Sequence, residues 1–321
     1  MRKILLLLLI TLFINSCKQT PSKLYFKKYD ESSEIEAQQK HEKKRMQFKL
    51  LQSHFLDLNK EFKPFEKELS KFSEEEYQQL KPLILEKDIP TIQKSITNKK
   101  LTYEKLTLFY LYRIRKYESD STKYLNAIIS LNPKVLEEAR AKDKEANEVN
   151  EYSLSGIPIL IKDNIDAEGM ITTAGAVALQ NNLTDNDAFI VKKLKEAGAL
   201  ILGKVNLSEW AYFFCEDCPL GYSAIGGQTL NPYGRKIFET GGSSSGSGVS
   251  VAANYAVAAV GTETAGSITS PSSQNSVVGL KPTIGVLSRS GIVPISSTLD
   301  TPGPMTKSIV DNAILFEAML G

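Results

Sequence analysis

The chain has 321 residues, 42% of them hydrophobic, which is enough to bury a sizeable core and too many for one small domain. Its 39 Lys and Arg residues nearly balance its 37 Asp and Glu residues, and the net charge is +2. This balance provides no electrostatic footprint for a polyanion, so we do not expect nucleic acid as a partner. We expect one large α/β domain with an N-terminal attachment.

The first 17 residues predict a secretory signal. Arg2 and Lys3 precede an apolar run over residues 4–14, which is too short to span a bilayer. The run leads into the letters INSC, which end at Cys17 and resemble a bacterial lipobox. Acyl chains on Cys17 would hold the protein at a membrane surface, and an ordinary signal peptide is the alternative. We therefore expect a membrane lipoprotein of the bacterial cell envelope, on the periplasmic or surface side.

Residues 18–80 predict a charged helical extension. Dense mixed charges up to about Lys60 leave little to bury, which favours a solvated stalk or a loosely held helix. Ser73, followed three residues later by Glu76, has the pattern of a capping box at a helix start. Apolar residues spaced by three and four over residues 106–117 predict a helix with one face packed on a core.

Beyond residue 150, short apolar segments predict strands at residues 157–161 and 199–202. A helix over residues 187–197 would end at Gly198, a usual C-terminal stop. Because strands and helices alternate, we expect an α/β sheet covered by helices.

Cys215 and Cys218 form a Cys-x-x-Cys pair. A local disulfide is one alternative for an exported protein, and a zinc site would lack its remaining ligands. We favour structural cysteines over a redox role.

Chemistry concentrates in two Gly- and Ser-rich segments, residues 241–248 and 261–271. The first contains Gly-x-Ser-x-Gly, the pattern of a nucleophile elbow, whose serine needs a histidine base. The only histidines, His41 and His54, lie in the charged N-terminal region, which argues against a Ser-His-Asp triad.

A nucleophilic serine still needs a base, and lysine is the available alternative. No Ser-x-x-Lys pattern occurs in the chain. Lys162 follows an apolar strand and precedes Asp163 and Asn164, so it is a candidate base. The residues alone leave open whether Lys162 is a buried base or a surface lysine at a strand end.

Four motifs in order resemble the amidase signature family over roughly residues 100–321. The motifs are residues 156–164, 203–210, 241–244 and 279–283. The resemblance implies a mixed central β-sheet covered by helices on both sides, within a domain over residues 81–321, and no metal or cofactor. Family members continue beyond the equivalent of Gly321, so we expect the C-terminal part of the domain to be missing from this chain.

The resemblance also implies a Ser-Ser-Lys triad. Neutral Lys162 would take a proton from Ser243, which follows a cis peptide bond and relays a proton from the nucleophile Ser267. Ser244 is the competing candidate for the bridging role. Because lysine has a pKa of about 10.4 in water, a neutral base near pH 7 requires a depression of roughly three units.

The backbone N–H groups of Thr264, Ala265, Gly266 and Ser267 are the oxyanion donors that the resemblance implies. Relatives commonly carry two glycines before the nucleophile, so a positive φ at Ala265 would introduce strain. Thr269 stands where relatives often have arginine.

Residues 261–264, 288–296 and 300–305 are most similar to the peptide amidase branch, whose members remove ammonia from C-terminal peptide amides. A small amide or peptide amide is therefore the expected substrate, with fatty acyl and aryl amides as alternatives. Arg289 and Asp300 are candidates for substrate contact, although a solvated arginine and a turn-forming aspartate are favoured. An inactive binding protein on this scaffold, a tRNA amidotransferase subunit and a phosphate-binding protein are the rival functions, and nothing indicates the oligomeric state.

Overall fold

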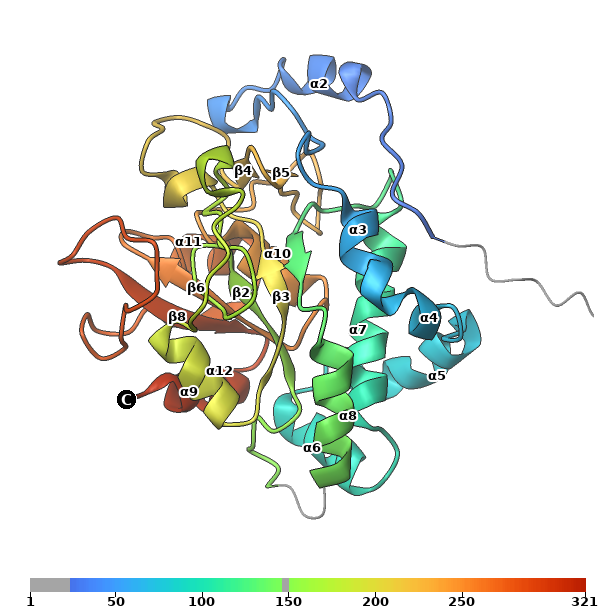
Figure 1. Ribbon diagram of the computed structural model, residues 1–321. Helices are drawn as coiled ribbons and strands as arrows, with labels where there is room; N and C mark the ends of the chain where they lie inside the picture. Colours follow the sequence, from blue (N-terminus) through green and yellow to red (C-terminus); the bar gives the residue numbers. More distant parts are fainter. Residues whose placement is uncertain (1–23, 146–149) are drawn as a thin grey trace, which may run out of the picture.

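The computed structural model describes residues 24–145 and 150–321 and has a central mixed sheet flanked by helices (Figure 1). The sheet has six strands in the order β1-β3-β2-β6-β8-β7. The strands are β1 Ile128–Leu131, β2 Pro158–Lys162, β3 Leu200–Val205, β6 Ala258–Glu263, β7 Val278–Gly279 and β8 Thr301–Thr306. β2 pairs in parallel with β3 and β6, and the other pairs are antiparallel. The expected α/β fold with a mixed sheet is confirmed.

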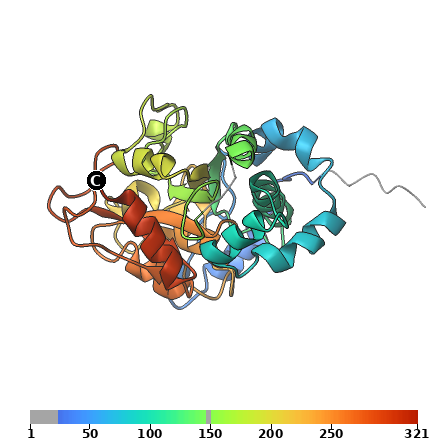
Figure 2. The same ribbon diagram turned by 90° about the horizontal axis from the view of Figure 1, so that it is seen from below.

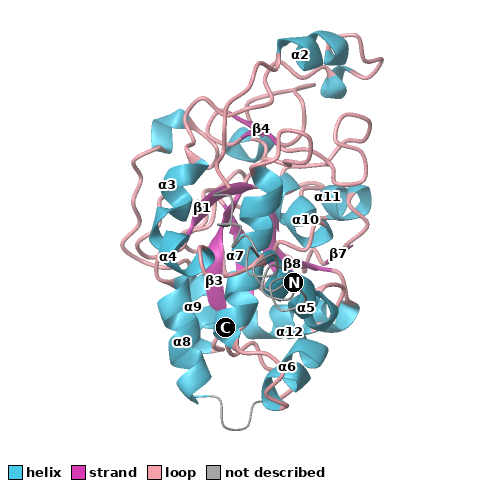
Figure 3. Ribbon diagram, turned by 90° about the vertical axis from the view of Figure 1, so that its right-hand side faces the viewer, coloured by secondary structure: helices cyan, strands magenta, loops and turns pink. Residues whose placement is uncertain are grey.

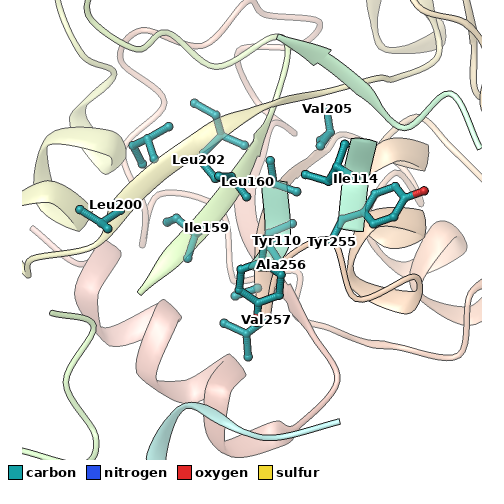
Figure 4. Packing of buried hydrophobic residues seen from close by; sticks show 14 of the residues in the cluster. Tyr110, Ile114, Ile159, Leu160, Leu200, Leu202, Val205, Tyr255, Ala256 and Val257 are labelled. Carbon is teal, nitrogen blue, oxygen red and sulfur yellow. The ribbon is translucent and has the colours of Figure 1, made fainter. Parts of the chain in front are cut away.

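The central strands β2, β3 and β6 are buried along their whole length, as the apolar runs at residues 157–161 and 199–202 predict for β2 and the first half of β3. Ile159 and Leu160 of β2 lie beside Leu200 and Leu202 of β3 in the core, and Tyr110 packs nearby (Figure 4). Figures 2 and 3 show helices on both sides of this sheet. The sheet therefore gives a rigid base to the loops that follow its strands.

The helices from α3 to α8 form a layer beside the sheet (Figure 2). They are α3 Leu58–Phe62, α4 Glu66–Leu69, α5 Glu74–Ile84, α6 Ile89–Thr97, α7 Tyr103–Glu118 and α8 Val135–Glu145. The Ser73 hydroxyl accepts the amide N–H of Glu76 at 3.0 Å and caps α5, so the predicted helix start is confirmed. The apolar face of α7 is buried, as its spacing predicts.

The remaining elements lie outside this layer. They are helices α2 Ser32–Gln38, α9 Phe189–Glu196, α10 Ser245–Ala252, α11 Thr269–Gln274 and α12 Ile309–Met319, the hairpin strands β4 Tyr222–Ser223 and β5 Gly227–Gln228, and short 3-10 helices at Lys44–Met46, Lys63–Phe65, Val177–Leu179 and Glu209–Tyr212. Gly198 has a φ of +89° after α9, so the predicted glycine stop is confirmed.

The solvated stalk expected up to about residue 60 is wrong for the described part of that segment. Met46, Phe48 and Leu51 are buried in the main core cluster. The Leu51 carbonyl also accepts the amide N–H of Gln228 at 2.9 Å, which ties the segment to β5. The apolar residues are few, but Met46, Phe48 and Leu51 are enough to attach the segment to the core, so low hydrophobic density here does not mean solvation.

The predicted signal and Cys17 lie outside the described residues. Within residues 24–145 and 150–321, no helix has both the length and the apolar character needed to cross a membrane.

Candidate active site

Lys162 is the last residue of β2 and is fully buried. Its Nζ atom lies 2.7 Å from the Ser243 hydroxyl and 2.9 Å from the Thr262 hydroxyl. Since β6 runs parallel to β2, Thr262 near the end of β6 is brought beside the end of β2. The alternative of a surface lysine is therefore excluded.

Burial lowers the pKa of Lys162 from the usual 10.5 to about 7, against the opposing negative charges of Asp300 and Glu263. No carboxylate of the described residues lies within 4.0 Å of the Lys162 amine to form an ion pair. A substantial fraction of Lys162 is thus neutral near pH 7, and a neutral amine can accept a proton.

Ser243 and Ser244 have different surroundings. The Gly242–Ser243 peptide bond is cis, as the resemblance implied. The Ser244 hydroxyl donates to the Thr262 carbonyl at 3.0 Å and accepts the Thr262 N–H at 3.1 Å. Because Ser244 is occupied by the backbone of β6, the hydroxyl that contacts Lys162 belongs to Ser243.

Ser267 follows β6 in a separate loop and is 9% exposed. Its carbonyl accepts the amide N–H of Ser244 at 3.1 Å, which joins the two Ser-containing loops. Its hydroxyl makes no hydrogen bond to another described residue. Ser243 and Ser267 line the same two cavities, so the structure brings both hydroxyls to one place. Neither His41 nor His54 lines these cavities.

The loop before Ser267 is shaped by Gly266 rather than by Ala265. Gly266 has a φ of +91°, whereas Ala265 is not among the described residues with positive φ. The strain anticipated at Ala265 is therefore absent from the structure. The single glycine stands where the backbone requires one.

Glu263 fixes the backbone just after Ser267 through hydrogen bonds to its carboxylate. Its carboxylate accepts the amide N–H groups of Ile268 at 2.7 Å and Thr269 at 2.8 Å. Burial raises the pKa of Glu263, but the backbone N–H groups of Thr269, Ile268 and Gly266 outweigh it and lower the pKa below its usual range. The Gly266 amide therefore faces this carboxylate, which weakens the expectation that it is an oxyanion donor.

Asp300 and Arg289 both line the first cavity and both bind the protein itself. The Asp300 carboxylate accepts the Thr264 hydroxyl and the amide N–H groups of Ile295 at 2.8 Å and Ser296 at 2.9 Å. The Arg289 guanidinium donates to the carbonyl of Ser297. Asp300 is thus a turn-forming residue, and Arg289 is held by the loop rather than solvated.

The two cavities meet at the serines. The first, of about 250 Å³, is lined mainly by the loop over residues 289–302 and by the end of β6. The second, of about 370 Å³, is lined by residues 211–213, by the loop over residues 264–267 and by Arg45. A substrate bond placed at Ser267 would have room on either side.

The sequence assigned no role to several residues of the site. The Thr262 hydroxyl accepts a hydrogen bond from the Lys162 amine. The Asn164 side-chain amide donates to the same hydroxyl at 3.0 Å. Asp163, which follows Lys162 in sequence, forms a fully buried ion pair with Lys204 at 3.7 Å. The only signal for them was their place within or beside the motifs.

Cys215 and Cys218 form a disulfide in the loop after Glu209–Tyr212. This outcome agrees with structural cysteines. Phe213 and Phe214, which precede the disulfide, are exposed and contact each other edge to face.

Comparison with known proteins places this geometry in a family. The Amidase family model matches residues 105–321. A probable amidase of Arabidopsis thaliana is 43% identical over 74% of this chain and 46% of its own length. An amidase family protein from Bacillus anthracis is 43% identical, covers 84% of this chain and 54% of its own, and has a TM-score of 0.79. The native peptide amidase from Stenotrophomonas maltophilia is 49% identical over 74% of this chain and 48% of its own, with a TM-score of 0.70.

The chain spans about half the length of these relatives. The match nevertheless includes β2, β6 and the loops that carry Lys162, Ser243 and Ser267. The resemblance drawn from the four motifs is confirmed, and the chain belongs to the Amidase family.

Proposed function

We propose that this protein hydrolyses a carboxylic amide through an acyl-enzyme, with Ser267 as the nucleophile, Ser243 as the relay and Lys162 as the base. One observation carries the proposal: a buried Lys162 amine with a pKa of about 7 contacts the Ser243 hydroxyl at 2.7 Å, in a site that Ser267 shares. A buried lysine with a depressed pKa, placed next to a hydroxyl in a cavity, is a usual arrangement for activating a nucleophile.

In the proposed reaction, the Ser267 oxygen attacks the amide carbonyl carbon. Its proton passes to Ser243 while the Ser243 proton passes to Lys162. The tetrahedral oxyanion is stabilised by backbone N–H groups of the loop over residues 264–267, among which those of Thr264, Ala265 and Ser267 have no other acceptor in the described chain. The C–N bond then breaks, and the leaving nitrogen receives the proton held by Lys162 through Ser243. Water hydrolyses the resulting ester by the same route in reverse.

The proposed substrate is a peptide C-terminal amide, which would release ammonia. The similarity to the Stenotrophomonas maltophilia peptide amidase supports this choice. Fatty acyl and aryl amides would use the same three residues. Ammonia release from peptide amides, compared with turnover of fatty amides and anilides, separates these substrates. No turnover of any amide would favour the rival function of an inactive binding protein.

The nucleophile is tested with a serine-directed fluorophosphonate. Labelling of the wild-type protein and loss of labelling in Ser267→Ala would support the assignment. Ser273→Ala is the matched control, because Ser273 is exposed on α11 and does not line either cavity. Equal labelling of Ser267→Ala and wild type would overturn it.

We further propose that the protein is a membrane lipoprotein anchored through Cys17. The lipobox-like end of the apolar run supports this proposal. Cys17→Ser should move the mature protein from the membrane fraction to the soluble fraction of the envelope. Unchanged fractionation would leave the ordinary signal peptide as the better interpretation.

A further inference from the structure

The wall of the second cavity includes a cationic side chain that has no role in the proposed reaction. Arg45 lines this cavity together with Ser243 and Ser267, and its wall includes Tyr212 and Phe213. Arg45 is the only charged residue of that lining. It belongs to the N-terminal segment, outside residues 105–321 that the family model matches. The cation therefore comes from the part of the chain that precedes the matched residues.

Arg45 is held at this place by its neighbours. It lies in the 3-10 helix Lys44–Met46, where Met46 is buried in the core. The Tyr212 hydroxyl donates to the Cys218 carbonyl at 2.8 Å and also contacts Arg45. The segment carrying Arg45 is thus anchored on one side by the core and on the other by the loop that the disulfide closes.

The guanidinium has no carboxylate partner. Among the described residues, none places a carboxylate within 4.0 Å of Arg45, whereas its neighbour Lys44 lies 3.9 Å from Asp217. In the first cavity, by contrast, Arg289 binds backbone carbonyls, and Glu263 and Asp300 bind backbone amides. Arg45 is therefore the charged group near the serines that keeps donors available for a ligand.

We propose that Arg45 binds a carboxylate on the amide substrate, so that the site prefers peptide amides with an acidic residue near the scissile bond. This inference rests on the proposed function, since it names the substrate class of the same site. A guanidinium pairs with a carboxylate through two parallel N–H donors, which gives direction as well as affinity. Because Arg45 is exposed, water and salt weaken the pair, and the expected preference is roughly two- to fivefold.

The test compares acetylated dipeptide amides. Glu, Met or Lys is placed in turn at the residue that bears the amide and, in a second series, at the residue before it. Met matches the length of Glu without its charge and without a second carboxamide. We expect kcat/KM to be higher for Glu than for Met by the stated factor at one position, mainly through KM, and lowest for Lys. Arg45→Met should abolish the preference for Glu, and Arg45→Glu should reverse it in favour of Lys.

Lys49→Met is the matched control. Lys49 is an exposed cation of the same segment that does not line the cavity, so this variant should keep the preference for Glu. Hydrolysis of all three substrates with equal kcat/KM would overturn the inference and leave the proposed function standing. The inference is equally overturned if Arg45→Met keeps the preference. If no amide is hydrolysed, the proposed function fails and the inference falls with it.

Discussion

Glu263→Gln removes one negative charge next to the loop that carries Ser267 while keeping the shape of the side chain. In the structure, one carboxylate oxygen of Glu263 accepts the N–H groups of Ile268 and Thr269, which follow Ser267 directly. The hydroxyl of Thr262, the residue before Glu263, accepts a hydrogen bond from the Lys162 amine. Glu263 thus links the position of Ser267 to β6, whose Thr262 hydroxyl contacts the Lys162 amine.

The size of the effect follows from the two hydrogen bonds at 2.7 and 2.8 Å. Bonds to a charged acceptor contribute about 1.5–3 kcal/mol each and bonds to a neutral acceptor about 1 kcal/mol, so the pair should lose about 2 kcal/mol. If this loss is expressed as misplacement of Ser267, kcat falls about 10- to 30-fold. KM should change little, because Glu263 holds the loop rather than the substrate.

The pH profile gives a second readout that a purely structural role would not change. The negative charge of Glu263 raises the pKa of Lys162, against the larger effect of burial. Without that charge the Lys162 pKa falls further, so the acid limb of kcat/KM should move to lower pH. The assay is ammonia release from a peptide amide, measured from about pH 5 to about pH 9.

Glu118→Gln is the control for this prediction. Glu118 is also a buried carboxylate that accepts backbone amides, those of Leu125 and Asn126, and it lines neither cavity of the site. Glu118→Gln should leave the acid limb in place. The reasoning is refuted if the acid limb of Glu263→Gln stays where it is in wild type or moves to higher pH.

Three further predictions concern the base, the relay and the loop over the first cavity. Lys162→Met should abolish hydrolysis and, because the folded-state pKa of about 7 lies below the unfolded value, should raise Tm more near pH 6 than near pH 9, as thermal unfolding would show. Ser243→Ala should lower kcat by about 10²–10⁴. Ser244→Ala should lower kcat less than about tenfold and chiefly reduce stability, since the Ser244 hydroxyl binds only the backbone of β6; a larger kcat loss in Ser244→Ala would contradict the assignment. Asp300→Asn should raise KM more than it lowers kcat, because the carboxylate fixes the backbone of Ile295 and Ser296 at the cavity wall; an unchanged KM would argue against a role for this loop in substrate binding.

The sequence predicted the parts of the fold whose signal is local. Continuous apolar runs predicted β2 and β3 to within a few residues, and Ser73 and Gly198 marked the ends of helices. β8 was missed as a strand because Pro302 and Pro304 lack the N–H groups of a usual ladder. It nevertheless pairs with β6 and β7.

The site was predictable only in part, because much of it depends on contacts between distant residues. Motifs singled out Lys162, Ser243 and Ser267, and Lys162 at the end of an apolar strand was a physical candidate for a buried amine. Periodicity and propensity give no signal for the contact between Glu263 and the loop after it. They also could not show that the charged segment around Arg45 folds back onto the cavity. That segment packs through a few separated apolar residues, which sequence patterns do not distinguish from a stalk.

The rate at which Ser267 reacts with a fluorophosphonate, measured against pH in wild type and in Lys162→Met, tests the proposed mechanism most directly. If neutral Lys162 activates Ser267 through Ser243, the wild-type rate should rise through a single ionisation near pH 7, and the Lys162→Met rate should be slow and lack that ionisation. A wild-type rate that does not change between about pH 5 and about pH 9, or the same ionisation in Lys162→Met, would contradict the account.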